Sequence, residues 1–91
     1  MTDDWDAVGF VVSSRYRVLV LRRLAEGPAS PSTIATDADV AISHVSRALS
    51  ELSEHSLVEL LVPEPRKKGR IYGLTDHGED VWDHIESSGL A

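Results

Sequence analysis

The chain has 91 residues, enough for one small domain, and it is acidic, with 15 Asp and Glu against nine Lys and Arg. It contains no cysteine, which excludes disulfides, thiolate zinc sites and a cysteine nucleophile. No apolar run approaches the roughly 20 residues of a membrane helix, and the acidic start is unlike a secretory signal peptide. We therefore expect a cytoplasmic protein.

The first 25 residues predict an extension followed by a helix. Residues 1–12 begin with acidic side chains and then become apolar, so we expect an N-terminal extension that packs on the core. Ser13 and Ser14 are helix N-cap residue types, and a helix begins after one of them and runs to about Ala25, where Gly27 and Pro28 follow. The apolar residues of this segment recur at helical spacing: Tyr16, Leu19, Val20 and Leu24.

Two further helices follow with a tight turn between them. Ser30 can cap a short helix over about 31–38, because proline fits its first position. After a turn at 37–40, the segment ISHVSRALSELSE predicts a longer helix over about 42–54. Its buried stripe has the spacing i, i+3, i+4, i+7 and consists of Val45, Ala48, Leu49 and Leu52. A short helix, a turn and a longer amphipathic helix form a helix-turn-helix.

The other side of this longer helix is polar in an unusual way. A helix face that only meets water more often carries Glu and Lys, whereas these side chains are short or hydrogen-bonding: Ser43, His44, Ser46, Arg47 and Ser50. Arginine can contact guanine through two hydrogen bonds or bind a phosphate, and small serines allow close approach. The pattern favours contact with DNA, and a solvated face without a ligand is the alternative.

A β-hairpin is expected next. Val58, Leu60 and Val62 alternate on one side of a first strand, and residues 71–74 form a returning strand. The connection holds four of the nine cations of this acidic chain, namely Arg66, Lys67, Lys68 and Arg70. We expect them to bind phosphates or to enter a minor groove, with an accidental charge run in a solvated loop as the alternative.

The remaining residues predict one more helix. Thr75 and Asp76 form a plausible N-cap pair, and Gly89 ends the helix, whose apolar face comprises Val81, Trp82 and Ile85. We assign residues 13–75 to the DNA-binding domain and residues 76–91 to a C-terminal helix that is a candidate dimerisation element. Apolar side chains at the two chain ends either pack together or form a dimer seam: Trp5, Phe10, Trp82, Ile85 and Leu90.

The element order predicts a mainly α fold with a small β-hairpin: a winged helix-turn-helix with a three-helix core, a wing and a C-terminal helix. Through the motifs ISHVSRALSEL, LVEL and GRIYGLTDHG, about residues 13 to 82 resemble archaeal winged helix-turn-helix transcriptional regulators of the MarR/ArsR type. The resemblance implies a sequence-specific regulator that binds double-stranded DNA. It also implies a homodimer that reads palindromic half-sites about one helical turn apart.

Docking of this kind places the recognition helix, about 42–54, in the major groove and the basic wing, 63–70, on the DNA backbone or in the minor groove. One departure concerns Ser56, which stands where such chains usually have glycine after the recognition helix. A serine in the left-handed conformation costs on the order of 1 kcal/mol, so either the helix ends differently or this cost is accepted.

Several other polar residues have alternative interpretations. The start of the second helix could contact a phosphate or only cap the helix, through Ser30, Ser32 and Thr33. We expect the arginines of the first helix to pair with nearby carboxylates on the surface: Arg15, Arg17, Arg22 and Arg23. His55 is expected to be a cation at a helix end. A metal site is only weakly indicated, by His77, Asp80 and His84.

Function classes can be ranked on these patterns. No nucleophile elbow, phosphate loop or metal-hydrolase spacing is present, so we expect neither an enzyme nor a cofactor. The alternatives to a DNA-binding regulator are an interaction adaptor whose acidic last helix contacts a partner, and a metal-sensing repressor. Only two lysines beside eight Asp predict a protein adapted to the salt of a haloarchaeal cytoplasm, with a mildly acidic mesophilic protein as the alternative.

Overall fold

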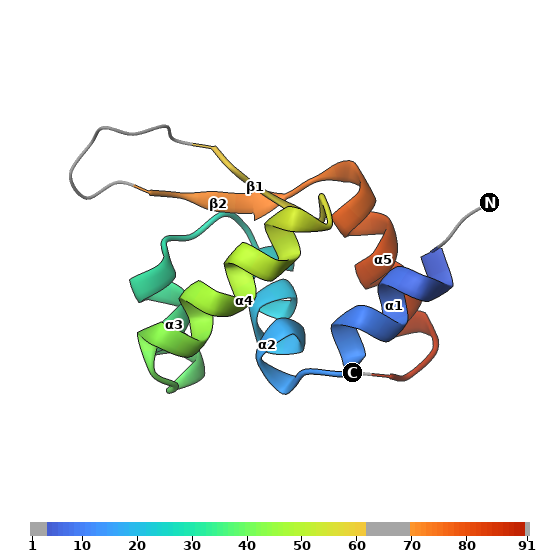
Figure 1. The fold of residues 1–91 in the computed structure, drawn as a ribbon, viewed down its shortest axis with the longest axis horizontal. Helices are drawn as coiled ribbons and strands as arrows, with labels where there is room; N and C mark the ends of the chain where they lie inside the picture. Colours follow the sequence, from blue (N-terminus) through green and yellow to red (C-terminus); the bar gives the residue numbers. More distant parts are fainter. Residues whose placement is uncertain (1–3, 62–69, 91) are drawn as a thin grey trace.

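The computed structural model describes residues 4–61 and 70–90, and within them the predicted fold class is confirmed (Figure 1). The elements in chain order are α1 (Asp4–Val12), α2 (Arg15–Ala25), α3 (Pro31–Ala38), α4 (Ile42–Glu54), β1 (Val58–Leu60), β2 (Tyr72–Leu74) and α5 (Asp76–Ser87). None of the described helices is long and apolar enough to cross a membrane.

The helix α1 was not predicted, because the sequence indicated only an extension for residues 1–12. It lies against α5 and α2 at the end of the molecule away from α3 (Figure 1). Val8 and Val11 are fully buried in the common core, and Phe10 packs against that core from the side. The two ends of the chain therefore meet through α1 and α5.

The helix-turn-helix has the predicted boundaries and caps. Ser14 caps α2, and Ser30 caps α3 by accepting a hydrogen bond from the backbone N–H of Thr33 at 3.2 Å. Asp39 ends α3 in the left-handed conformation, with φ of 58°, and so turns the chain toward α4. Aspartate adopts this conformation more readily than most residues.

One hydrophobic core holds these elements together. The predicted stripe of α4 is buried, and it packs on α2 and α3. Burial of this apolar area is the main source of folding free energy and fixes the face that α4 turns outward. The largest fully buried side chains are Leu21, Ile34, Leu52, Leu57, Ile85, Val11, Val20, Val45 and Val81.

The sheet is antiparallel, with Val58 opposite Leu74 and Leu60 opposite Tyr72. An isolated bridge adds Ala29, which lies between α2 and α3. Its N–H donates to the Tyr72 carbonyl at 3.0 Å, and the Tyr72 N–H donates back at 2.9 Å. These two hydrogen bonds tie the start of the helix-turn-helix to the wing strand and were not predicted.

The expected alternation along β1 is only partly correct. Val58 is buried as predicted, but Leu60, on the same side, is 38% exposed, and Val62 lies outside the described residues. Side chains two residues apart in a strand share one face. The weaker burial of Leu60 therefore marks where the helices stop covering the sheet.

The junction between α4, β1 and α5 is made by Thr75. As predicted, Thr75 caps α5: its hydroxyl accepts from the Gly78 N–H at 2.9 Å. The same hydroxyl donates to the Ser56 carbonyl at 2.7 Å. Ser56 has φ of 59°, so the chain accepts the left-handed serine after the recognition helix, at a cost on the order of 1 kcal/mol.

Gly78 allows this junction to close. A Cβ atom at this position would overlap the carbonyl oxygen of Leu57, which also accepts a hydrogen bond from the Thr75 N–H at 3.1 Å. Only glycine lets α5 approach the backbone at the start of β1 so closely. The last glycine of the sequence motif GRIYGLTDHG, Gly78, is therefore required for a steric reason.

We predict that Gly78→Ala lowers the free energy of unfolding by about 3 kcal/mol, because backbone would have to move to relieve the overlap. Chemical denaturation followed by circular dichroism measures this change. Gly9→Ala is the matched control: Gly9 lies in α1 with open space around its Cβ position, so alanine should raise stability by about 0.5–1 kcal/mol. Equal stability of the Gly78→Ala protein and the wild type would contradict the role given to Gly78.

Candidate nucleic-acid interface

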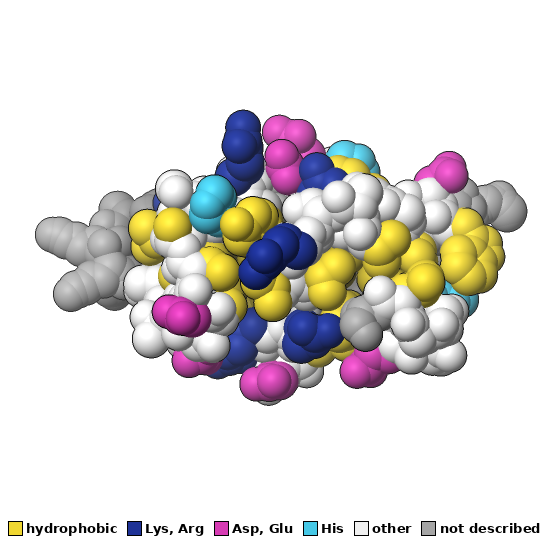
Figure 2. Space-filling model, turned by 90° about the horizontal axis from the view of Figure 1, so that it is seen from below, with side chains coloured by type: hydrophobic (Ala, Val, Ile, Leu, Met, Phe, Trp, Pro, Cys, Tyr) yellow, Lys and Arg dark blue, Asp and Glu magenta, His cyan; other side chains and the backbone are white. Residues whose placement is uncertain are grey.

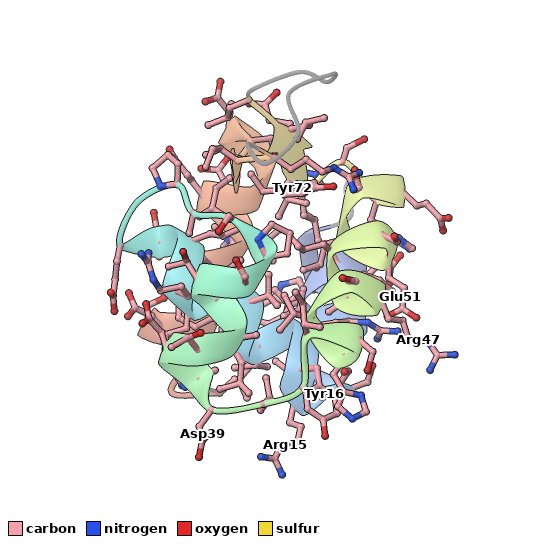
Figure 3. All side chains as sticks on the ribbon, turned by 90° about the vertical axis from the view of Figure 1, so that its left-hand side faces the viewer. Arg15, Tyr16, Asp39, Arg47, Glu51 and Tyr72 are labelled. Atoms are coloured by element: carbon pink, nitrogen blue, oxygen red, sulfur yellow. The ribbon has the colours of Figure 1, made fainter. Side chains whose placement is uncertain are left out.

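The outward face of α4 carries the five predicted base-reading residues. Burial of the stripe on α2 and α3 leaves Ser43, His44, Ser46, Arg47 and Ser50 exposed. Figure 3 shows Arg47 and Glu51 projecting from this outer side of α4. No carboxylate lies in residues 42–50, although the chain is strongly acidic. The structure thus brings the predicted side chains together on one accessible surface.

Arg47 is the most reachable cation of this face. Its side chain is 79% exposed, and its Nε lies 4.0 Å from Oε2 of Glu51, one helical turn away. An exposed ion pair at this distance contributes little to stability, so the guanidinium can readily exchange Glu51 for another acceptor. Arg47 therefore extends from α4, and the stability of the fold depends little on its contact with Glu51.

Glu51 has a closer partner in Arg17, and the sequence did not predict this particular pair. Arg17 of α2 donates from Nε to Oε1 of Glu51 at 3.0 Å, and its Nη1 donates to the carbonyl of Phe10 at 2.7 Å. The Arg17 guanidinium also lies over the Phe10 ring at 4.0 Å. Arg17 therefore compensates the carboxylate nearest to Arg47 and links α1 to α4.

The other arginines of α2 divide into two kinds. Arg23 pairs with Asp37 at 2.8 Å, so the predicted carboxylate pairing is confirmed for Arg17 and Arg23. Arg15 and Arg22 instead lie over aromatic rings, Arg15 at 5.4 Å from the Tyr16 centroid and Arg22 at 5.9 Å from that of Trp82. Among the ion pairs between described residues, neither of these two arginines takes part.

His44 has an aromatic neighbour from α2. Its ring stacks on that of Tyr16 with centroids 4.3 Å apart and an interplanar angle of 9°. The sequence placed Tyr16 only in the buried stripe of α2, and the structure shows it half-buried at the edge of the α4 face. Its position at the beginning of α2 and its polar tip were the available signals, because such a ring packs on one side and meets water on the other.

The start of α3 carries the residues proposed for a phosphate. The Ser30 hydroxyl is engaged as the cap and also donates to the Thr33 hydroxyl at 3.0 Å, which confirms the capping role. Ser32 and Thr33 are exposed. The backbone N–H of Thr33 already donates to the Ser30 hydroxyl, whereas that of Ser32 lies in the first turn, where a helix has unpaired donors.

Most of the wing cluster belongs to residues 62–69, which lie outside the described part of the chain. These residues include Arg66, Lys67 and Lys68, whereas Arg70 is exposed ahead of Ile71 and β2. Ile71, next to it, accepts a hydrogen bond from the Leu61 N–H at 2.7 Å, which fixes the root of the hairpin. Arg70 is thus the one wing cation whose position is described.

The other three histidines lie outside the exposed face of α4. His55 is at the C-terminal end of α4, and His77 and His84 are in α5. His55 follows α4 as its C-cap, stacks on Phe10 with centroids 3.7 Å apart, and its Nδ1 lies 3.1 Å from the Glu51 carbonyl. The ring of His84 lies 5.8 Å from that of Trp5. Across residues 4–61 and 70–90, no three His, Asp or Glu side chains are grouped so that they could hold a metal, and His77, Asp80 and His84 form no such group.

Comparison with solved structures identifies regulators of the same fold. The reduced form of the transcriptional regulator YodB from B. subtilis matches with a TM-score of 0.78 at 21% identity, over 98% of this chain and 88% of that one. NMB1585, a MarR family regulator from Neisseria meningitidis, matches with 0.69 at 25% identity over 78% of this chain. ZitR from Lactococcus lactis, as a C30AH42A mutant, matches with 0.67 at 23% identity over 82%.

The matched regions differ in how much of each neighbour they cover. This chain spans about half of the length of the Neisseria and Lactococcus regulators, 51% and 50%. The search of curated proteins gave no match. A family model described as the HVO_A0261 N-terminal domain matches residues 5–89, which is nearly the whole chain. The chain therefore belongs to the HVO_A0261 N-terminal domain family.

Proposed function

We propose that the chain is a sequence-specific transcriptional regulator that binds double-stranded DNA through α4. The observation that carries this proposal is the exposed face of α4, which combines an accessible arginine and histidine with small serines and has no carboxylate over residues 42–50. Phosphates repel carboxylates, so a surface that meets DNA is expected to lack them. The fold shared with known regulators supports the same function.

In this proposal the first half of α4 enters the major groove. Ser43 and Ser46 permit a close approach, His44 offers a ring nitrogen to a base edge, and Arg47 contacts guanine or a phosphate. Glu51 does not oppose this docking because Arg17 neutralises it at 3.0 Å. Five other carboxylates of the chain lie on α5, on a different side: Asp76, Glu79, Asp80, Asp83 and Glu86.

The wing and α3 are proposed to bind the DNA backbone. The wing cations Arg66, Lys67, Lys68 and Arg70 would meet phosphates or a narrow minor groove. The start of α3 would offer a phosphate the Ser32 backbone N–H and the hydroxyls of Ser32 and Thr33, since the Thr33 N–H is taken by the Ser30 cap. At ~1 M salt the Debye length is about 3 Å, so only cations in close contact attract DNA. An acidic chain from a haloarchaeal cytoplasm would then need positive charge only where it touches DNA.

A homodimer is proposed through residues 1–12 and 76–91. Trp5 is 65% exposed and Leu90 48% exposed, and both belong to the end where α1 packs on α5. Hydrophobic side chains also gather at this end in the view from below (Figure 2). A second copy could cover them and place two α4 helices on the two half-sites of a palindrome.

The second candidate function is a protein-interaction adaptor. A surface cavity of about 590 Å³ lies between α2, the hairpin and α5, and its lining includes Leu61 and Trp82. Four carboxylates also line it: Glu26, Glu79, Asp83 and Glu86. This composition suits a partner with basic and apolar side chains. The metal-sensing alternative gains no support from the described part of the chain.

The function is tested by fluorescence anisotropy with a labelled duplex from upstream of the chain's own gene and a scrambled duplex, in a KCl series that reaches molar salt. We expect tighter binding to the native duplex. Alanine at Arg66, Lys67, Lys68 and Arg70 should weaken binding to both duplexes and reduce the salt slope by about 0.9 for each phosphate that is no longer neutralised. A folded wild type that binds no duplex at any salt would instead favour the adaptor.

The docking of α4 is tested with Arg47→Ala in the same assay. We expect the preference for the native over the scrambled duplex to fall about tenfold or more, because the variant cannot form the paired hydrogen bonds to guanine. Arg22→Ala is the matched control, because Arg22 is exposed on α2 and lines the acidic cavity. Unchanged affinity and preference in Arg47→Ala would contradict the docking of α4 in the major groove.

A further inference from the structure

The stack between Tyr16 and His44 joins α2 to the outer face of α4. The two rings lie nearly parallel, with centroids 4.3 Å apart and 9° between their planes. Figure 3 shows Tyr16 at the start of α2, beside the first turn of α4. His44 is exposed, whereas Tyr16 is half-buried and packs against the core, so the tyrosine is the anchored member of the pair.

Anchoring matters because an exposed histidine in the first turn of a helix would otherwise sample several rotamers. Tyr16 belongs to a helix whose Val20, Leu21 and Leu24 are buried, so its backbone is held by the core, and its ring packs against the edge of that core. Contact of the two ring faces favours one orientation of the imidazole. The nitrogens of the imidazole lie at the ring edge, so stacking by the face leaves both of them able to form hydrogen bonds.

We propose that Tyr16 is a positioning residue for base recognition, which rests on the proposed function. Tyr16 holds the His44 ring so that one nitrogen faces a purine edge in the major groove. A ring N–H directed there donates to purine N7, and at guanine also to O6. A side chain that is oriented before binding loses less conformational freedom in the complex, so the contact discriminates better between bases.

The contacts that hold each side chain distinguish the role of His44 from that of Arg47. Arg47 is 79% exposed, and its contact with Glu51 at 4.0 Å holds it only loosely, so it can follow either a base or a phosphate. His44 is restrained on one face and has a short side chain. We therefore expect His44 to determine the base preference at one base pair, whereas Arg47 contributes both to the affinity for DNA and to the base preference.

The test selects binding sites from a random duplex library with the full chain. The wild type is compared with Tyr16→Phe, Tyr16→Leu, His44→Ala and the double variant Tyr16→Leu/His44→Ala. Tyr16→Phe keeps the ring and should select the wild-type motif. Tyr16→Leu should lower the purine preference about fivefold at the one position where His44→Ala also lowers it, and the double variant should be no worse than His44→Ala alone.

Two measurements separate positioning from a general loss of structure. Thermal unfolding and affinity for a scrambled duplex should change little in Tyr16→Leu. Tyr72→Leu is the matched control, because Tyr72 is also half-buried against the core but lies in β2, and this variant should keep the motif. Full purine preference in Tyr16→Leu, or a weaker preference at a different position from His44→Ala, would overturn the inference. A wild type that selects no motif would refute the proposed function itself.

Discussion

The close approach of Gly78 to the carbonyl of Leu57 is the contact on which the arrangement of α4, the wing and α5 depends. It brings the first turn of α5 onto the backbone between α4 and β1. Thr75 then closes the junction from both sides, by capping α5 and by donating to the Ser56 carbonyl at 2.7 Å. The left-handed Ser56 turns the chain from α4 into this junction. These local features together set the angle between the recognition helix and the hairpin.

Charge is distributed unevenly over the resulting surface, and this division links the fold to the proposed function. The first turns of α2, α3 and α4 contain no acidic residue, whereas α5 begins with Asp76 and Glu79 in its first turn. The carboxylate of Glu51, close to Arg47, is held by Arg17. Such a division lets a chain with a net charge of −6 keep one face open to an anion.

The sequence predicted the parts of the fold that have local signals. The boundaries of α3 and α4 were correct because a serine–proline start and an amphipathic stripe mark them directly. The helix α1 was missed because it has only nine residues, contains Gly9 and three β-branched valines, and depends on packing against α5. Short helices are marginal alone, so tertiary contacts decide whether they form.

The candidate site was likewise predictable only where a local pattern marks it. The exposed residues of α4 could be predicted from its buried stripe. The two α2 residues that contact this face, Tyr16 and Arg17, could not. Tyr16 and His44 lie 28 positions apart, and Arg17 and Glu51 lie 34 apart. No local pattern pairs residues at such separations. The bridge between Ala29 and Tyr72 was missed for the same reason.

The most direct test of DNA binding through α4 is a map of the binding surface in solution. Amide chemical shifts of the labelled full chain would be followed by NMR while an unlabelled duplex is added. Docking through α4 predicts that the largest shifts fall in residues 42–50 and at Arg70, with small shifts along α5. Shifts concentrated around the acidic cavity between α2 and α5, with α4 unchanged, would contradict it.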